Sequence, residues 1–210
     1  MSLHLLFPTP VLVLDSYDQF DADNQELIAQ SYAEEKGSYG DFNTSKDTYI
    51  LDHHAPALRA WIQQQINEYA TNTLASTQPL KITQSWCLKH ENQPQKVFKH
   101  LHPNSIISGA YYVHAPEGTS NIKFHKETTS SAPVVKWETN EDLIAAQPWA
   151  WEWYEVPVQT GRLVLFPSNV HHSVEGTNVN ENMRCVLSFN TWFDGPIGSE
   201  LRLFRLGALQ

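Results

Sequence analysis

The spacing of apolar side chains along the chain changes at about residue 80. Before this point apolar residues recur at three- and four-residue steps, which predicts a helix from Asp21 or Asp23 to about residue 35 and a stronger helix over residues 56–74. Ahead of them, residues 11–14 have the composition of a short strand, and the neighbouring prolines place it at a sheet edge. After residue 80 the period is two, which is typical of β-strands.

Several runs after residue 80 have strand character, and turn-forming residues separate them. In the last run, alternate residues share a face, so Arg184, Ser188 and Asn190 are expected to point the same way. A mainly β fold with flanking N-terminal helices follows from this pattern. The predicted strands cover residues 80–88, 97–102, 105–115, 121–124, 151–158, 161–167 and 184–192, and residues 201–206 are a candidate for a final edge strand.

The polar segments between these runs predict the connections. Residues 91–94 are expected to form a turn and residues 176–182 a hairpin loop, and the strand at 105–115 is expected to pack beside the one at 97–102. Residues 126–160 are rich in Ser, Thr, Pro and Trp and form an insertion. Two interpretations of this insertion stay open, a lid or substrate surface and a structural loop held by its tryptophans.

No linker or repeat divides the chain, so one domain over residues 1–210 is expected. Within it, residues 1–79 supply the N-terminal strand and supporting helices, and residues 80–210 supply the β core with the insertion at 126–160.

Composition and charge narrow the possible partners. Hydrophobic residues make up 41% of the chain, enough for a real core, and the net charge of −9 disfavours binding to nucleic acid or an anionic membrane. Only Cys87 and Cys185 occur, which predicts free thiols rather than a disulfide framework. There is no convincing signal peptide and no apolar run of about 20 residues. We therefore expect a soluble, cytoplasmic protein that acts on a small-molecule or peptide substrate, with a homodimer possible.

Histidines carry the candidate chemistry. His100 and His102 are two residues apart in a predicted strand, so both can point into one cavity. Far downstream, His171 and His172 are adjacent, so only one of them can face inward, and we choose His172. Three imidazoles that leave open coordination positions suit a catalytic metal rather than a structural one.

Arg184 adds an anion-binding element. A guanidinium buried without a partner costs several kcal/mol, and no acidic residue near Arg184 in sequence is an obvious partner. A bound anionic cosubstrate is the simplest candidate, because a guanidinium pairs with a carboxylate in bidentate geometry.

These motifs together resemble a known enzyme family. The order His-x-His, Ser-Gly-x-Tyr-Tyr-Val, Gly-Arg-Leu-Val-Leu-Phe-Pro-Ser, a further His, then Arg in a Ser-Phe-Asn strand is similar to a bacterial and phage branch of the Fe(II)/2-oxoglutarate-dependent oxygenases, with a prolyl-hydroxylase-like layout. The resemblance spans nearly the whole chain. It implies a double-stranded β-helix, or jelly roll, with Fe(II) at its mouth.

The resemblance also implies roles for single residues. His100, His102 and His172 would bind the metal, and Arg184 would bind the distal carboxylate of 2-oxoglutarate. Ser188, Tyr111 and Tyr112 are weaker candidates for hydrogen bonds to the cosubstrate, because aromatic residues in a strand are more often part of the core. The implied activity is hydroxylation of a C–H bond, with release of succinate and CO2.

One position departs from the family pattern. His102 stands where the family usually has Asp or Glu. The site is therefore either a three-His site, or one in which His102 lies outside the coordination sphere and a carboxylate such as Glu127, or water, completes it. Two other function classes stay open. One is a cupin-like three-His enzyme that does not use 2-oxoglutarate, and the other is a non-enzymatic jelly-roll binding module.

Overall fold

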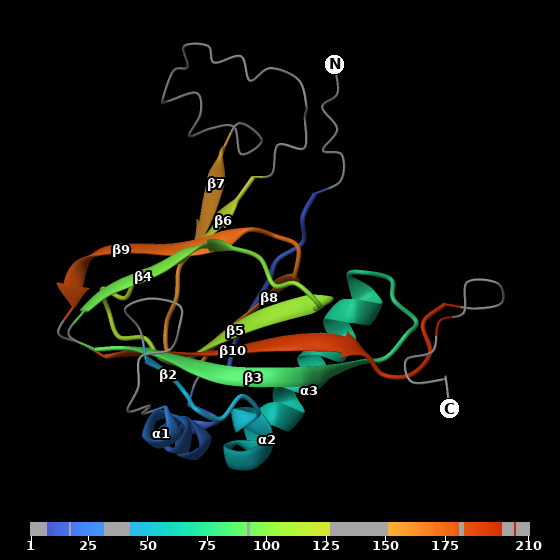
Figure 1. The fold of residues 1–210 in the computed structure, drawn as a ribbon, viewed down its shortest axis with the longest axis horizontal. Helices are drawn as coiled ribbons and strands as arrows, with labels where there is room; N and C mark the ends of the chain where they lie inside the picture. Colours follow the sequence, from blue (N-terminus) through green and yellow to red (C-terminus); the bar gives the residue numbers. More distant parts are fainter. Residues whose placement is uncertain are drawn as a thin grey trace, which may run out of the picture.

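A computed structural model describes residues 8–16, 18–31, 43–91, 93–126, 151–180, 183–198 and 204. Its described strands form two antiparallel sheets that face each other (Figure 1). The six-stranded sheet has the order β1 (Leu12–Asp15), β8 (Arg162–Pro167), β5 (Ile107–His114), β10 (Arg184–Phe193), β3 (Leu80–His90), β2 (Asn43–Thr44). The four-stranded sheet has the order β4 (Gln93–His100), β9 (His172–Asn180), β6 (Ile122–His125), β7 (Trp153–Val156).

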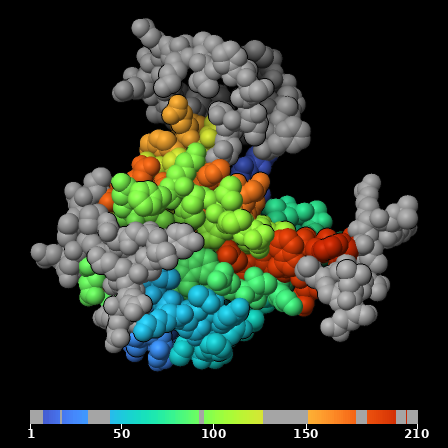
Figure 2. Space-filling model, viewed as in Figure 1, coloured from blue at the N-terminus to red at the C-terminus, as the bar shows by residue number. Residues whose placement is uncertain are grey.

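Three helices cover the outer face of the six-stranded sheet (Figure 1). They are α1 (Asp21–Gln30), α2 (Ile50–His54) and α3 (Pro56–Asn72). Their apolar side chains form one core with the outward-facing residues of the sheet, among them Tyr111, Leu187 and Phe189. In the space-filling view of Figure 2 the helices, blue to cyan, form one flank of the molecule, and the four-stranded sheet lies on the opposite side.

A second core lies between the two sheets. Ala110, Tyr112 and Val186 reach it from the six-stranded sheet, and Ile122 and Phe124 from the four-stranded sheet. Alternate residues of β10 therefore serve different cores, which confirms the predicted face pattern of that strand. Two sheets packed face to face over one core, in an antiparallel arrangement, give the predicted double-stranded β-helix.

Two predictions about neighbouring strands were wrong. β5 does not pack beside β4, because β4 pairs with β9 in one sheet and β5 pairs with β8 and β10 in the other. Residues 176–180 are not a loop but the second half of β9, where Asn180 pairs with Gln93. The turn predicted at residues 91–94 is correspondingly shorter, since β4 begins at Gln93. Polar composition misled at residues 91–94 and 176–180, because these two segments are rich in polar residues.

The N-terminal predictions hold with shifted ends. The edge strand exists as β1, and the stronger helix exists as α3. Asp23 does not cap its own helix, which has no side-chain cap; its carboxylate accepts the backbone N–H of Leu58 at 2.7 Å, in the first turn of α3. A carboxylate at that end satisfies an unpaired helix N–H and complements the helix dipole.

A glycine allows close packing in the centre of the six-stranded sheet. A Cβ atom at Gly109 would lie 2.2 Å from Cζ of Phe189, the residue opposite it on β10. The ring of Phe189 therefore fills the space that a side chain at position 109 would need.

Both cysteines, Cys87 and Cys185, lie buried as free thiols on the same outer face, as predicted. No helix among the described ranges is long and apolar enough to cross a membrane.

A two-pronged ion pair fastens the edge strand β1 to β8. Nε and the terminal Nη2 of Arg162 donate to the two carboxylate oxygens of Asp15 at 2.7 and 2.8 Å, and the two residues pair across the strands. Hydrogen bonding from Arg162 lowers the pKa of Asp15. The pair therefore stabilises the fold where Asp15 is ionised, and this contribution is lost as the pH falls through the lowered pKa.

We expect Asp15→Asn to lower the free energy of unfolding by about 1 kcal/mol at neutral pH, because the ion pair is two-pronged and partly buried. The difference from the wild type should shrink toward zero in acid, below the pKa of Asp15. Urea denaturation at the two pH values measures it. Asp194→Asn, which breaks the exposed pair with Lys81, is the matched control and should change little at either pH. An equal loss in both variants would contradict this reading.

Candidate metal centre

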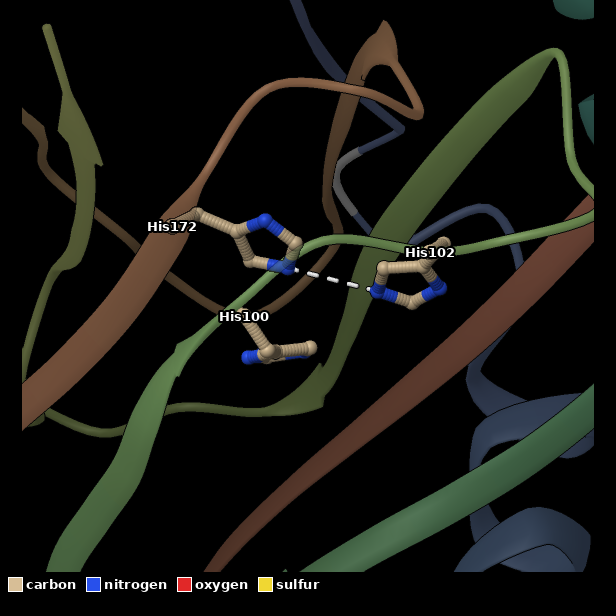
Figure 3. A group of neighbouring side chains, drawn as sticks. All are labelled: His100, His102 and His172. Carbon is tan, nitrogen blue, oxygen red and sulfur yellow. Dashed lines mark hydrogen bonds between the residues drawn. The ribbon is translucent and has the colours of Figure 1, made fainter. Parts of the chain in front are cut away.

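Three histidines from two strand ends converge at one end of the space between the sheets (Figure 3). His100 is the last residue of β4, His172 is the first of β9, and the two are partners across these strands. His102 lies two residues beyond β4, where its backbone N–H donates to the carbonyl of Ser168 at 3.0 Å. The β4–β9 pairing thus places His100 and His172 side by side, and a separate backbone hydrogen bond places His102.

The spacing of the His102 and His172 rings suits one metal ion, and a ring nitrogen of His100 lies close to both. Nε2 of His102 lies 3.3 Å from Nε2 of His172, and one ring nitrogen from each histidine lies within 4.8 Å of the others. Two nitrogen ligands about 2.1 Å from a common ion, at angles between 90° and tetrahedral, are about 3.0–3.4 Å apart. The observed pair distance falls in this interval.

Hydrogen bonds fix which nitrogen of each ring is available. Nδ1 of His100 lies 2.7 Å from the carbonyl oxygen of Phe98, and Nδ1 of His172 lies 3.0 Å from that of Val170. A carbonyl only accepts, so both Nδ1 atoms carry the proton and both Nε2 atoms present a lone pair. Nδ1 of His102 lies 2.7 Å from the side-chain oxygen of Asn190, which has the same effect. This arrangement of outer hydrogen bonds is typical of metal-binding histidines.

Burial keeps the imidazoles of His102 and His172 neutral. It lowers the pKa of His102 to about 4 and that of His172 to about 3, with the neighbouring His100 adding to both shifts. His172 is also enclosed by aromatic rings, since the Phe166 ring lies 4.7 Å from its own and the Phe124 ring 6.1 Å. Neutral imidazole is the form that binds metal, so at neutral pH the lone pairs of His102 and His172 are available for a metal ion.

Arg184 lies deeper between the sheets. Its side chain is 2% exposed, its guanidinium carbon lies 5.5 Å from the centre of the Tyr112 ring, and its Nε has no hydrogen-bond partner. Opposite it on β3 stands His90, whose pKa is lowered to about 4 by burial and by Arg184 itself. Among the described residues no carboxylate pairs with Arg184, so a buried positive charge with an open donor faces the interior. This is the environment that an anionic ligand would complete.

The weaker candidates for cosubstrate binding lie on different faces of the six-stranded sheet. Ser188 and Tyr112 lie on the interior face with Arg184, buried to 9% and 1% exposure. Tyr111 faces the helices instead, where its hydroxyl lies 3.0 Å from that of Ser16, so it is a core residue and not part of the site. Whether Ser188 and Tyr112 contact a cosubstrate stays a prediction.

The structure shows which of the other histidines lie near this cluster. Of the neighbouring pair His171 and His172, it is His172 whose ring joins the cluster. His125 lies away from it, with Nε2 2.9 Å from the hydroxyl of Ser173. Glu127 is outside the described residues. Within the described ranges the cluster contains no carboxylate, and Nε2 of His102 points at the other rings, which favours the three-His arrangement.

A family comparison agrees with this geometry. The family model described as "Putative 2OG-Fe(II) oxygenase" matches residues 84–190, which is the segment that carries all three histidines and Arg184. This match covers half of the chain. The protein belongs to the 2OG-Fe(II) oxygenase family. A search of the curated proteins finds no match.

Solved structures show the same fold at low sequence identity. An oxidoreductase of the 2OG-Fe(II) oxygenase family from Burkholderia pseudomallei aligns with TM-score 0.56 and 13% identity, over 86% of this chain and 83% of the other. A prolyl-4-hydroxylase from Pseudomonas putida aligns with TM-score 0.57 and 12% identity, over 88% and 92%. HygX from Streptomyces hygroscopicus, solved with nickel, 2-oxoglutarate and hygromycin B, aligns with TM-score 0.53 and 10% identity, over 87% and 82%. These likenesses confirm the double-stranded β-helix.

The residues of the 2OG-Fe(II) oxygenase site fit the family's cofactors, Fe(II) and 2-oxoglutarate, as predicted. Three bare imidazole nitrogens offer a ligand set that a first-row transition metal accepts. The unpartnered Nε of buried Arg184 offers a donor for a carboxylate. The chain therefore offers suitable groups for both cofactors, the three histidines for Fe(II) and Arg184 for 2-oxoglutarate.

Two contributors to the site were not predicted. Asn190 was placed on the correct face of its strand but given no role, although its amide holds His102. Trp86, on β3, stacks on His102 with ring centres 6.0 Å apart and planes inclined by 25°. Period-two alternation identified the face of each residue, but contact with His102 depends on how the segment after β4 crosses the sheet.

We expect His172→Ala to abolish stoichiometric binding of Ni(II), measured by isothermal calorimetry, because His172 is the most buried of the three histidines. His171→Ala is the matched control, since it removes the adjacent imidazole that lies outside the cluster, and it should bind like the wild type. Retained binding in His172→Ala, or loss in His171→Ala alone, would contradict the assignment.

Proposed function

We propose that this protein is a non-haem Fe(II)- and 2-oxoglutarate-dependent hydroxylase that uses His100, His102 and His172 as its metal ligands. The observation that carries the proposal is the combination of three oriented imidazoles at one end of the jelly roll with an uncompensated guanidinium deeper inside. The family supplies the cofactors, and the reaction proposed here is insertion of oxygen into a substrate C–H bond.

The three histidines would hold the metal through their Nε2 atoms, and each Nδ1 stays bonded to its oxygen acceptor. When bound, Fe(II) with 2-oxoglutarate supplies the oxidation: one atom of O2 enters the substrate as a hydroxyl and the other enters succinate, with loss of CO2. The protein contributes position. The aromatic rings of Phe166 and Phe124 beside His172 exclude water from one side of the cluster.

Arg184 would bind the far carboxylate of 2-oxoglutarate. The carboxylate would replace the missing partner of Nε and neutralise a charge that burial makes costly, as shown by the lowered pKa of Arg184. Tyr112 fixes the guanidinium from its side through the cation–π contact. The neighbouring His90 is neutral at neutral pH and so does not compete as a second cation.

Charge balance is consistent with a neutral ligand set. Three imidazoles leave the full charge of Fe(II), and the dianion of 2-oxoglutarate brings a matching charge of opposite sign. Part of that negative charge is shared with Arg184. A site with a carboxylate ligand would carry one more negative charge inside the same apolar surroundings, at a desolvation cost.

Substrate would approach past His100, the mouth side of the cluster. Phe98 and Leu101 flank this residue and are 67% and 36% exposed. Exposed apolar side chains beside a half-buried ligand favour a substrate with an apolar part, either a small molecule or a peptide.

A second candidate is a cupin-like metal enzyme that uses the three histidines without 2-oxoglutarate. The absence of a carboxylate from the cluster, among the described residues, favours it. The two candidates differ in the need for Arg184. The oxygenase requires it for cosubstrate affinity, and the cupin-like enzyme does not.

We expect the Fe(II)-loaded protein to form succinate from 2-oxoglutarate in the presence of O2, with slow release even without substrate. Arg184→Met should weaken 2-oxoglutarate binding by at least about tenfold, because a hydrogen bond to a charged group contributes about 1.5–3 kcal/mol. Anaerobic calorimetry with the Ni(II)-loaded protein measures this affinity without turnover.

Arg162→Lys is the control, since Arg162 serves β1 through Asp15 and not the interior. It should leave 2-oxoglutarate affinity unchanged. Metal binding without any 2-oxoglutarate binding in the wild type would support the cupin-like alternative. A protein that binds neither would exclude both enzymes.

A further inference from the structure

Of the three candidate metal ligands, His102 differs from His100 and His172 in the group that accepts the hydrogen bond from its Nδ1 atom. The Nδ1 atoms of His100 and His172 are held by backbone carbonyls, which no substitution removes. Nδ1 of His102 is held by a side chain, the amide oxygen of Asn190, at 2.7 Å. The state of this one imidazole is therefore set by a single residue 88 positions away in sequence.

The amide of Asn190 is itself held in place. The hydroxyl of Ser108 donates to the same amide oxygen at 3.1 Å, and it lies 2.7 Å from the hydroxyl of Ser168. Ser168 in turn donates to Ser105 at 2.8 Å. Ser108 and Ser168 are almost fully buried, so this chain of hydroxyls is shielded from water. Such a network orients a buried amide because each member has its partners inside the protein.

The network also ties together the segments that carry the ligands. Ser168 precedes β9 and its carbonyl accepts the backbone N–H of His102. Ser105 accepts the N–H of Thr191, next to Asn190, at 3.1 Å. The position of the His102 backbone and the direction of its ring are thus set by the same cluster of residues.

We propose that Asn190 is a positioning residue for the metal centre, which keeps His102 in the tautomer with a proton on Nδ1 and a bare Nε2, and that Ser108 holds the amide for this task. The inference rests on the proposed metal site. Because an amide oxygen is neutral, Asn190 orients His102 without adding charge, unlike the carboxylate partner that often holds a metal-binding histidine.

The first test uses the metal-free protein. Nitrogen-15 NMR of histidine-labelled protein reports which ring nitrogen carries the proton. His102 should show the Nδ1–H tautomer in the wild type, and Asn190→Leu should shift it toward a mixture or toward Nε2–H. A wild-type His102 with its proton on Nε2 would overturn the inference.

The second test is metal affinity, measured by calorimetry with Ni(II). Asn190→Leu should weaken binding about 10- to 100-fold, as the loss of such outer partners does at other metal sites. Asn190→Asp keeps the acceptor and should bind at least as tightly as the wild type. Ser108→Ala should cause a smaller loss in the same direction. A purely structural role for Asn190 predicts that the Leu and Asp variants weaken binding equally.

Gln84→Ala is the matched control, because Gln84 is the partner of Asn190 across β3 and β10 and makes no hydrogen bond to His102. It should leave both tautomer and affinity unchanged. Thermal unfolding of each metal-free variant identifies any that fail to fold.

If the wild type binds Ni(II) and the variants behave as described, but no succinate forms with Fe(II), the proposed function fails and the positioning role stands. Unchanged tautomer and affinity in Asn190→Leu overturn the positioning role alone.

Discussion

Three imidazole rings in this protein each donate from Nδ1 to a fixed oxygen, and the rest of the site depends on that constraint. Without it, each ring could rotate or change tautomer, and three neighbouring lone pairs would not point at one place. Two of the acceptors are backbone carbonyls, one within β4 and one in the turn before β9, so the main chain itself orients His100 and His172. The third acceptor belongs to β10, the strand that begins with Arg184.

β10 therefore connects the two functions of the site. Its interior face carries Arg184 at one end and Asn190 toward the other, and its outer face packs Leu187 and Phe189 against the helices. The close contact of Phe189 with Gly109 fixes this strand against β5. A rigid central strand sets the separation between the anion-binding guanidinium and the ligand that Asn190 holds. This is how core packing on one face determines geometry on the other.

Period-two alternation predicted most strands and the inward face of Arg184, because side-chain direction in a strand is a local property. It also predicted that His100 and His102 lie together. The stated reason, two residues on one face of a strand, is incomplete, because β4 ends at His100 and His102 lies beyond it. The pairing of β4 with β9 rather than with β5 could not be predicted, because it depends on long-range topology. The hydrogen-bonded serines that hold the amide of Asn190 could not be predicted for the same reason. These serines lie up to 63 residues apart in the sequence, and a serine carries no signal of its own.

The central claim is that the metal is bound by three neutral imidazoles and no protein carboxylate. X-ray absorption spectroscopy of the Fe(II)-loaded protein without 2-oxoglutarate tests it most directly, because imidazole rings give a multiple-scattering pattern from their outer atoms that carboxylates and water lack. The account predicts a fit with three imidazoles per iron, with the remaining positions filled by light-atom ligands. A fit with two imidazoles and one carboxylate would contradict it.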